Sequence, residues 1–259
     1  MGVFGRRIIP PWPDESNRVM RSARNKLVGQ LLAIAAVLLI LKVTASVVLG
    51  YRHYYPPNFR SDFLLGREPY FFGPYQWAFY THIAVGPATL LLGLVLVSDR
   101  FRARYPMWHR SFGKLQGILV LMLLCPSGLW MAQYAQTGTV AGVGLSLLAV
   151  ATAACVLLGW RAAVQRRFAD HRRWMWRCFL LMCSAVVLRV IGGFVAVTGI
   201  GSDWAYPFAT WASWLGPLAC FELWRIARQH LQRSKGRGAS YSAASAALSP
   251  QSMEISARR

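Results

Sequence analysis

Residues 139–160 read TVAGVGLSLLAVATAACVLLGW, and no side chain in this stretch is charged. A helix of this length is about 33 Å long, which is enough to cross the hydrocarbon core of a bilayer. The stretch therefore predicts a transmembrane helix. The whole chain of 259 residues agrees with this interpretation, because 55% of it is hydrophobic and 13% is aromatic.

Five further segments of similar length and apolar content flank this span on both sides. The segment before it contains Pro126, at which we expect a kink. We predict an all-α membrane protein with six transmembrane helices, in which the second to fifth spans form a four-helix core. The six predicted spans cover residues 27–49, 76–97, 111–134, 139–160, 174–198 and 204–226.

The basic residues are distributed unevenly between the two sides of these spans. Lys and Arg number 29 against 9 Asp and Glu, and the formal net charge is +20. Of the 29, 24 fall in the terminal segments and in the connections on one side, whereas three fall on the other. Basic connections remain in the cytoplasm. We expect a protein of the bacterial inner (plasma) membrane with both termini cytoplasmic. Nucleic acid is excluded as a partner, because the charges lie between apolar runs and form no single patch.

Composition divides the chain into three parts. Residues 1–26 are predicted to be a basic cytoplasmic tail, 27–233 a six-span membrane domain, and 234–259 a disordered cytoplasmic tail. The last part is rich in Ser, Ala, Gly and Arg, which bury too little apolar surface to fold. No nucleophile–base motif or phosphate-binding loop appears in the sequence, which argues against a soluble enzyme. Whether the chain catalyses any reaction stays open.

Ionisable residues inside spans are costly, and they are usually paired or functional. His82 and Arg189 lie at similar depth in the outer halves of the second and fifth spans. Eighteen residues make five turns, so His171 and Arg189 share one face of a straight helix. We expect Arg189 to point into the bundle near His82. Gly86 and Gly93 share the helical face of His82 and would allow a close helix contact or leave room for a flat ligand.

Two other ionisable residues have structural interpretations. Lys42 lies near the outer end of the first span, and its long stem is expected to reach the interface. Glu222 lies near the inner end of the sixth span and is expected to pair with Arg177 or His171.

Two similar motifs open the third and fifth spans. Residues 108–113 read WHRSFG and residues 171–177 read HRRWMWR, so both place a histidine and an arginine at a helix N-terminus. Such ends attract anions. One interpretation is interfacial anchoring by Trp and Arg. The other is a shared site, with His109 and His171 on the same membrane side and on adjacent helices. His109, Gln116 and Ser127 also share one face of the third span.

These motifs resemble those of a bacterial family of multi-pass membrane proteins known only as a domain of unknown function. The resemblance covers roughly residues 75–195 and implies no established activity. The shared pattern comprises a span histidine, H-R-x-x-G, H-x-x-W-M-x-R and a later span arginine. In this chain these are His82; His109, Arg110 and Gly113; His171, Trp174, Met175 and Arg177; and Arg189.

A looser similarity connects the chain with membrane b-type cytochromes, which place histidines on a four-helix core as axial haem ligands. Two-haem versions need four such histidines, and this core has three. The similarity implies at most one haem b, with His109 and His171 as its metal ligands. His82 and Arg189 would then serve a quinone or a proton.

Three functions therefore remain open. The first is an integral membrane protein that binds a small ligand or anion through an intramembrane site containing His82, His109, His171 and Arg189. The second is an electron-transfer protein linked to a b-type haem or a quinone. The third is a non-catalytic assembly or sensor subunit. The lipid bilayer is a partner in all three, and the oligomeric state is open.

Overall fold

The computed structural model describes residues 15–60, 63–135 and 138–247. The predicted all-α class is confirmed, because these residues form helices and no strand. Five helical segments in the described ranges are long and apolar enough to cross a membrane, which makes the chain a multi-pass membrane protein. They are Ala23–His53, Pro74–Leu96, Pro106–Ala132, Thr139–Val164 and Phe168–Thr198.

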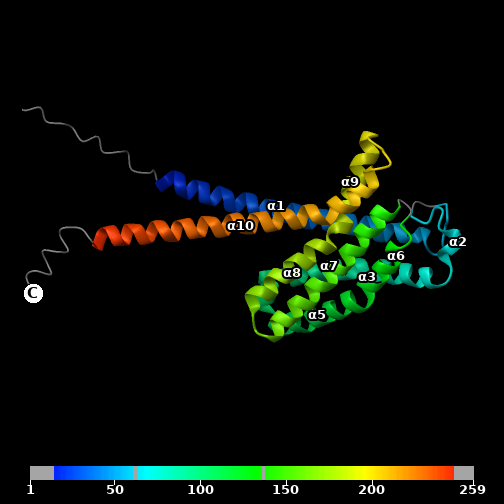
Figure 1. Cartoon of the computed structure of the whole chain (residues 1–259), viewed down its shortest axis with the longest axis horizontal. Coiled ribbons are helices and arrows are strands. Elements are labelled where there is room, and N and C mark those ends of the chain that lie inside the picture. Colours follow the sequence, from blue (N-terminus) through cyan, green and yellow to red (C-terminus); the bar gives the residue numbers. More distant parts are fainter. Residues whose placement is uncertain (1–14, 61–62, 136–137, 248–259) are drawn as a thin grey trace, which may run out of the picture.

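The long helices are joined by short ones (Figure 1). The elements in chain order are α1 (Glu15–Gly50), η1 (Tyr51–His53), α2 (Glu68–Phe71), α3 (Pro74–Leu96), α4 (Asp99–Arg104), α5 (Pro106–Leu119), η2 (Val120–Leu124), α6 (Cys125–Ala132), α7 (Thr139–Val164), α8 (Phe168–Met182), α9 (Ser184–Thr198) and α10 (Ala205–Ala247).

Four helical segments form a closed ring. α3 packs against the α5–η2–α6 segment, this segment packs against α7, α7 packs against α8, and α8 returns to α3. The ring places α5 diagonally opposite α8, and these two helices have no extensive contact with each other. The second to fifth predicted spans therefore supply the four helices of the core.

The third span contains a wide turn, η2, where the sequence predicts a kink. This turn is π-helical, and the Cys125 N–H donates to the carbonyl of Val120, five residues earlier. Pro126 follows immediately and has no N–H to donate, so the regular pattern of helical hydrogen bonds cannot continue through it. A π turn is one way in which a helix absorbs such a break.

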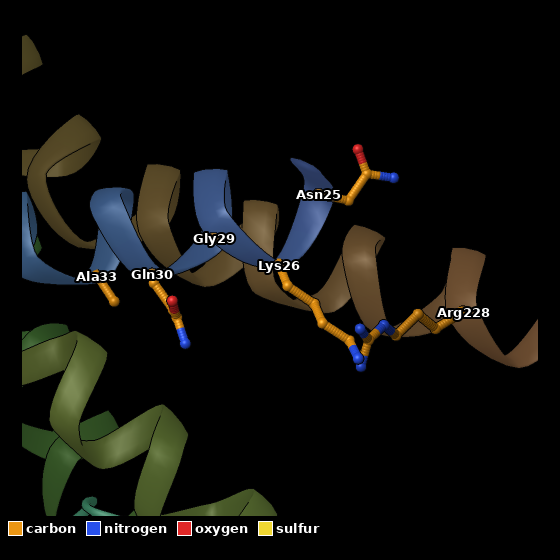
Figure 2. A pocket seen from close by; sticks show the side chains of 6 residues that line it. All are labelled: Asn25, Lys26, Gly29, Gln30, Ala33 and Arg228. Atoms are coloured by element: carbon orange, nitrogen blue, oxygen red, sulfur yellow. The ribbon is translucent and has the colours of Figure 1, made fainter. Parts of the chain in front are cut away.

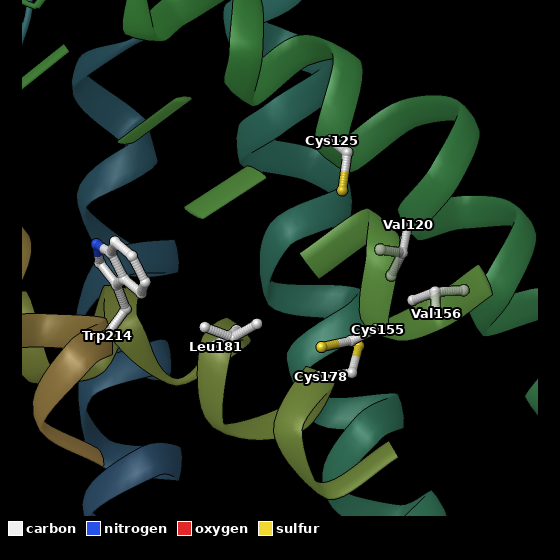
Figure 3. Close-up of a cluster of buried hydrophobic side chains, with 7 residues drawn as sticks. All are labelled: Val120, Cys125, Cys155, Val156, Cys178, Leu181 and Trp214. Atoms are coloured by element: carbon white, nitrogen blue, oxygen red, sulfur yellow. The ribbon is translucent and has the colours of Figure 1, made fainter. Parts of the chain in front are cut away.

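The centre of the bundle is filled by small and medium-sized apolar side chains. Four of the five cysteines are buried, and all five are free. Cys155 and Cys178 lie close together where α7 meets α8 (Figure 3). Trp214 of α10 packs against the same cluster, so α10 belongs to the packed body of the protein. The cluster comprises Val120, Cys125, Cys155, Val156, Cys178, Leu181 and Trp214.

An aromatic cap closes one end of the core. Leu64 and Phe71 of the connection between α1 and α3 are fully buried against Tyr75 and Phe79 of α3. Arg67 is also buried: its Nε donates to the Tyr75 Oη at 3.1 Å, and its guanidinium lies over the Phe63 ring. We call this the capped end, and we call the opposite end, where α5 and α8 begin, the histidine end.

The fifth predicted span is not one straight helix. α8 ends at Met182, and α9 begins at Ser184 after a turn at Cys183. α9 then points away from the four-helix core, as Figure 1 shows. Side chains on the two sides of this turn therefore do not keep the facial relation that a straight helix would give them.

The last helix, α10, is long enough to span a membrane but less apolar than the five spans. Its first turns contain several Trp, Tyr and Pro residues, which lower the mean hydropathy. Two contacts fix it on the core. The Trp211 Nε1 donates to the carbonyl of Val140 at 3.0 Å, and the Arg177 Nε donates to the Glu222 Oε1 at 2.6 Å. The predicted pairing of Glu222 with Arg177 is confirmed.

Beyond the core, α10 runs beside α1 (Figure 1). Residues 234–247 of the predicted disordered tail are helical, and 248–259 lie outside the described residues. Residues 15–26 of the predicted N-terminal tail likewise belong to α1, and residues 1–14 are not described.

Candidate functional site

His109 and His171 lie at the histidine end of the core, near the first turns of α5 and α8. Both side chains are half-buried, and they are close enough for their charges to interact. The expectation of adjacent helices is wrong, because α5 and α8 are diagonal in the ring. The two histidines therefore lie at the same end of the core, on helices at opposite corners of the ring.

The orientation of the His171 ring is fixed by the neighbouring helix. Its Nδ1 lies 2.9 Å from the carbonyl oxygen of Gly159 in α7. A carbonyl oxygen can only accept a hydrogen bond, so Nδ1 carries the proton. In the neutral ring, Nε2 then has the free lone pair. A backbone carbonyl on Nδ1 is the usual way in which proteins hold an imidazole whose Nε2 binds a metal.

His109 supplies a second imidazole without a committed partner. Its Nδ1 is buried and has no hydrogen-bond partner in the part of the chain that the structure describes. A buried polar atom without a partner is costly, which points to a missing ligand or water. One turn further along α5, a Cβ built at Gly113 would meet no atom within 4 Å. This flank of α5 therefore has free space near the histidine.

An ion-pair network holds the chain at this end. Asp99 at the start of α4 binds Arg172 of α8 at 2.5 Å and Arg102 of its own helix at 3.0 Å. All three side chains are exposed, so each pair contributes at most about 1 kcal/mol. The pair between Asp99 and Arg172 also has a geometric effect. It links the connection between α3 and α5 to the residue that follows His171.

His82 in α3 has a different environment, because its ring is already satisfied within the bundle. The Ser127 hydroxyl donates to the carbonyl of Leu123 at 2.6 Å. Its oxygen can therefore accept a hydrogen bond from the His82 Nδ1, which lies 3.2 Å away. The ring also packs on Gly128, where a Cβ would lie 3.1 Å from the His82 Cε1.

Gly86 and Gly93, which the sequence places on the helical face of His82, lie against other side chains. A Cβ at Gly86 would meet only Leu124, and one at Gly93 would meet Met182, Phe179 and Gln116. Gly128 was missed because it lies on the third span, and periodicity within one helix does not reveal which residues of another helix oppose it. The nearest available signal is the S-G pair at 127–128, which directly follows Pro126.

An open groove of about 390 Å³ lies between α3 and the π turn of the third span. Ser127, the partner of His82, lines it together with Thr81. Two tryptophans and several apolar side chains form the remainder, so the groove is apolar with a small polar region. The lining residues are Pro74, Trp77, Ala78, Thr81, Met122, Leu123, Pro126, Ser127 and Trp130.

The expected burial of Arg189 inside the bundle is wrong. Its side chain is exposed, and its NH1 donates to the carbonyl of Ala185 in its own helix at 3.1 Å. The turn at Cys183 explains the difference, because it breaks the straight helix that would have aligned Arg189 with His171. The charge of Arg189 still lies within electrostatic range of Tyr51 and His82.

Within the described ranges, no group of three or more His, Cys, Asp or Glu side chains is placed to hold a metal ion. A haem iron takes at most two protein ligands, and histidine is one of the residues that bind it. The pair formed by His109 and His171 therefore has the ligand type and number that a haem iron needs.

Together, the helices and the site define a helical multi-pass membrane protein with a four-helix core and a histidine pair at one end. The chain belongs to the family described as "Predicted membrane protein (DUF2306)", whose match covers residues 79–225. The predicted resemblance to a membrane family of unknown function is thereby confirmed. The match includes all three core histidines, and it extends into α10 as far as Arg225. No curated protein and no solved structure matches the chain.

Proposed function

We propose that this chain binds one b-type haem between His109 and His171 and acts as an electron carrier in the membrane. The observation that carries the proposal is the pair itself. Two imidazoles lie at one end of the core on diagonal helices, and the carbonyl of Gly159 fixes the ring of one of them. Placing axial histidines on facing helices of a bundle is how haem sites are built in four-helix cores.

The residues at the histidine end fit this group in three respects. His171 offers Nε2, because its Nδ1 is used by Gly159. His109 has a buried nitrogen without a partner in the described part of the chain. The space beside Gly113 leaves room on the same flank of α5.

The protein's own side chains would supply binding and charge balance. When bound, the haem supplies a reversible one-electron couple. The carbonyl of Gly159 holds the imidazole of His171 in one orientation and raises its basicity as a ligand. Arg110, which follows His109, is available to neutralise a carboxylate, whereas Arg102 and Arg172 are already paired with Asp99.

The membrane arrangement that accompanies this proposal has six spans, with α10 as the sixth, and both termini in the cytoplasm of a bacterial cell. The distribution of 24 of the 29 basic residues on one side supports it. The contacts of α10 support it too, because Trp211 meets the start of α7 and Glu222 meets Arg177 in the second half of α8. In this arrangement the histidine end faces the cytoplasm.

The experiment is a reduced-minus-oxidised absorption spectrum of the full-length protein, produced with ample haem supply and purified in detergent. We expect haem bands in the wild type and in His53→Ala, a control at an exposed histidine outside the core. We expect the bands to be lost in His109→Ala and His171→Ala, with helical content retained in circular dichroism. A wild-type protein without bands would contradict the proposal.

A second candidate function is binding of a small lipid-soluble ligand, such as a quinone, in the groove beside His82. The groove favours it, because tryptophans line an apolar space that contains the hydroxyl bound to the His82 ring. A short-chain quinone should quench tryptophan fluorescence in the wild type. Ala78→Leu, which fills the groove, should weaken the quenching on the order of tenfold. Ala88→Leu on the same helix, outside the groove, should not. Equal quenching in both variants would contradict this candidate.

A further inference from the structure

A second, shallow groove lies along α1, away from the core histidines, and one residue of α10 also lines it. Its volume is about 760 Å³, and it is widely open. It is lined by Asn25, Lys26, Gly29, Gln30, Ala33 and Arg228.

Two cations meet in this groove. Figure 2 shows the side chains of Lys26 and Arg228 reaching from different helices to the same place, with Gln30 on the same side of α1. Neither cation has a carboxylate partner among the residues that the structure describes. The Arg228 guanidinium also packs over the Trp224 ring, 4.3 Å from its centroid, and this contact orients the side chain. An anion in the groove would balance both charges.

The depth of the groove indicates where that anion would come from. The apolar spanning segment of α1 begins at Ala23, so Lys26 lies in its first turn. Leu27, Leu31 and Leu32 follow on α1, and all three are exposed. Lys26 is therefore placed at the level of the lipid headgroups, and an apolar strip runs from it along α1 toward the centre of the membrane.

We propose that this groove binds the phosphate headgroup of an anionic phospholipid, whose acyl chains lie along the exposed apolar face of α1. Lys26 and Arg228 neutralise the phosphate, and the Gln30 amide donates to its oxygens or to the headgroup hydroxyls. Gly29 leaves the helix surface open, because a Cβ there would meet no atom within 4 Å. Basic pockets between membrane helices bind anionic headgroups in this way. The site is independent of the proposed haem.

The test is a lipid titration of the full-length protein, followed by native mass spectrometry. The three probes are phosphatidylglycerol, phosphatidylcholine and inorganic phosphate. The groove variant is Lys26→Gln with Arg228→Gln. The matched control is Lys114→Gln with Arg161→Gln, which removes the same charge from exposed positions outside the groove. Lys26→Arg with Arg228→Lys keeps the charge and serves as a rescue variant.

We expect the wild type to retain phosphatidylglycerol in preference to phosphatidylcholine. The groove variant should bind phosphatidylglycerol on the order of tenfold more weakly, and the control and rescue variants should bind it like the wild type. Equal affinity for both lipids, or equal loss in the groove variant and the control, would overturn the proposal. If inorganic phosphate displaces the lipid at matched concentration, the site takes free phosphate and the lipid assignment is wrong.

Discussion

His171 and His82 both lie in the four-helix core and both use Nδ1 for a hydrogen bond, but their surroundings differ. His171 is held by a backbone carbonyl on one side, and the charge of a second histidine is close to it. His82 is held by the Ser127 hydroxyl, and its ring is pressed against Gly128. The position of a histidine inside a membrane span is thus not enough to make it a ligand-binding residue. What distinguishes the two is whether another imidazole lies opposite.

The largest expected loss of stability comes from the contact that holds α8, the helix of His171, against α10. Glu222→Gln removes the carboxylate from the Arg177 guanidinium, which is mostly buried and would be left with an uncompensated charge. We expect a loss of about 1–3 kcal/mol, discounted for the partial exposure of the pair. Thermal unfolding of both proteins in detergent measures this loss of stability.

The control for this change is Asp170→Asn, which removes two ion pairs to exposed arginines, Arg167 and Arg173, at the start of the same helix and should cost at most about 1 kcal/mol. Equal stability of Glu222→Gln and the wild type would show that α10 is not anchored to the core through this pair.

A smaller effect is expected on the His82 side of the comparison. Gly128→Ala places a methyl group 3.1 Å from the His82 Cε1, so the ring must shift. We expect a loss of about 1 kcal/mol, because overpacking in a well-packed site costs this much or more. In a His82→Ala background the same substitution should be neutral or stabilising, since alanine favours helix. Additive losses in the double variant would show that the two residues are not in contact.

The smallest effect is expected at Arg189. Its side chain is exposed and bonds only to a carbonyl of its own helix, so Arg189→Leu should change stability by less than about 0.5 kcal/mol. The haem content should also remain unchanged. A marked loss of either quantity would indicate that the charge near Tyr51 and His82 has a role that the exposed position does not reveal.

The sequence predicted the features that depend on composition and on one helix at a time. The all-α class, the apolar spans before α10 and the Glu222–Arg177 pair all follow from hydropathy and depth. It did not predict the features that depend on how helices deviate from ideal geometry. The π turn before Pro126 and the turn at Cys183 each change the phase of a helix, so faces drawn on a straight helix no longer apply beyond them.

The diagonal placement of α5 and α8 was also beyond the sequence argument, because periodicity gives the buried face of a helix and not the identity of its neighbours. The same reason explains why Gly128 was missed as the residue against which the His82 ring packs.

The central claim is tested most directly by the ratio of haem to protein chain in three purified full-length proteins. The wild type and His82→Ala should each contain about one haem per chain, and His109→Ala should contain almost none. This result would assign the haem to the histidine end and leave His82 with a packing role. A ratio near zero in the wild type, or a loss of haem in His82→Ala alone, would contradict the account.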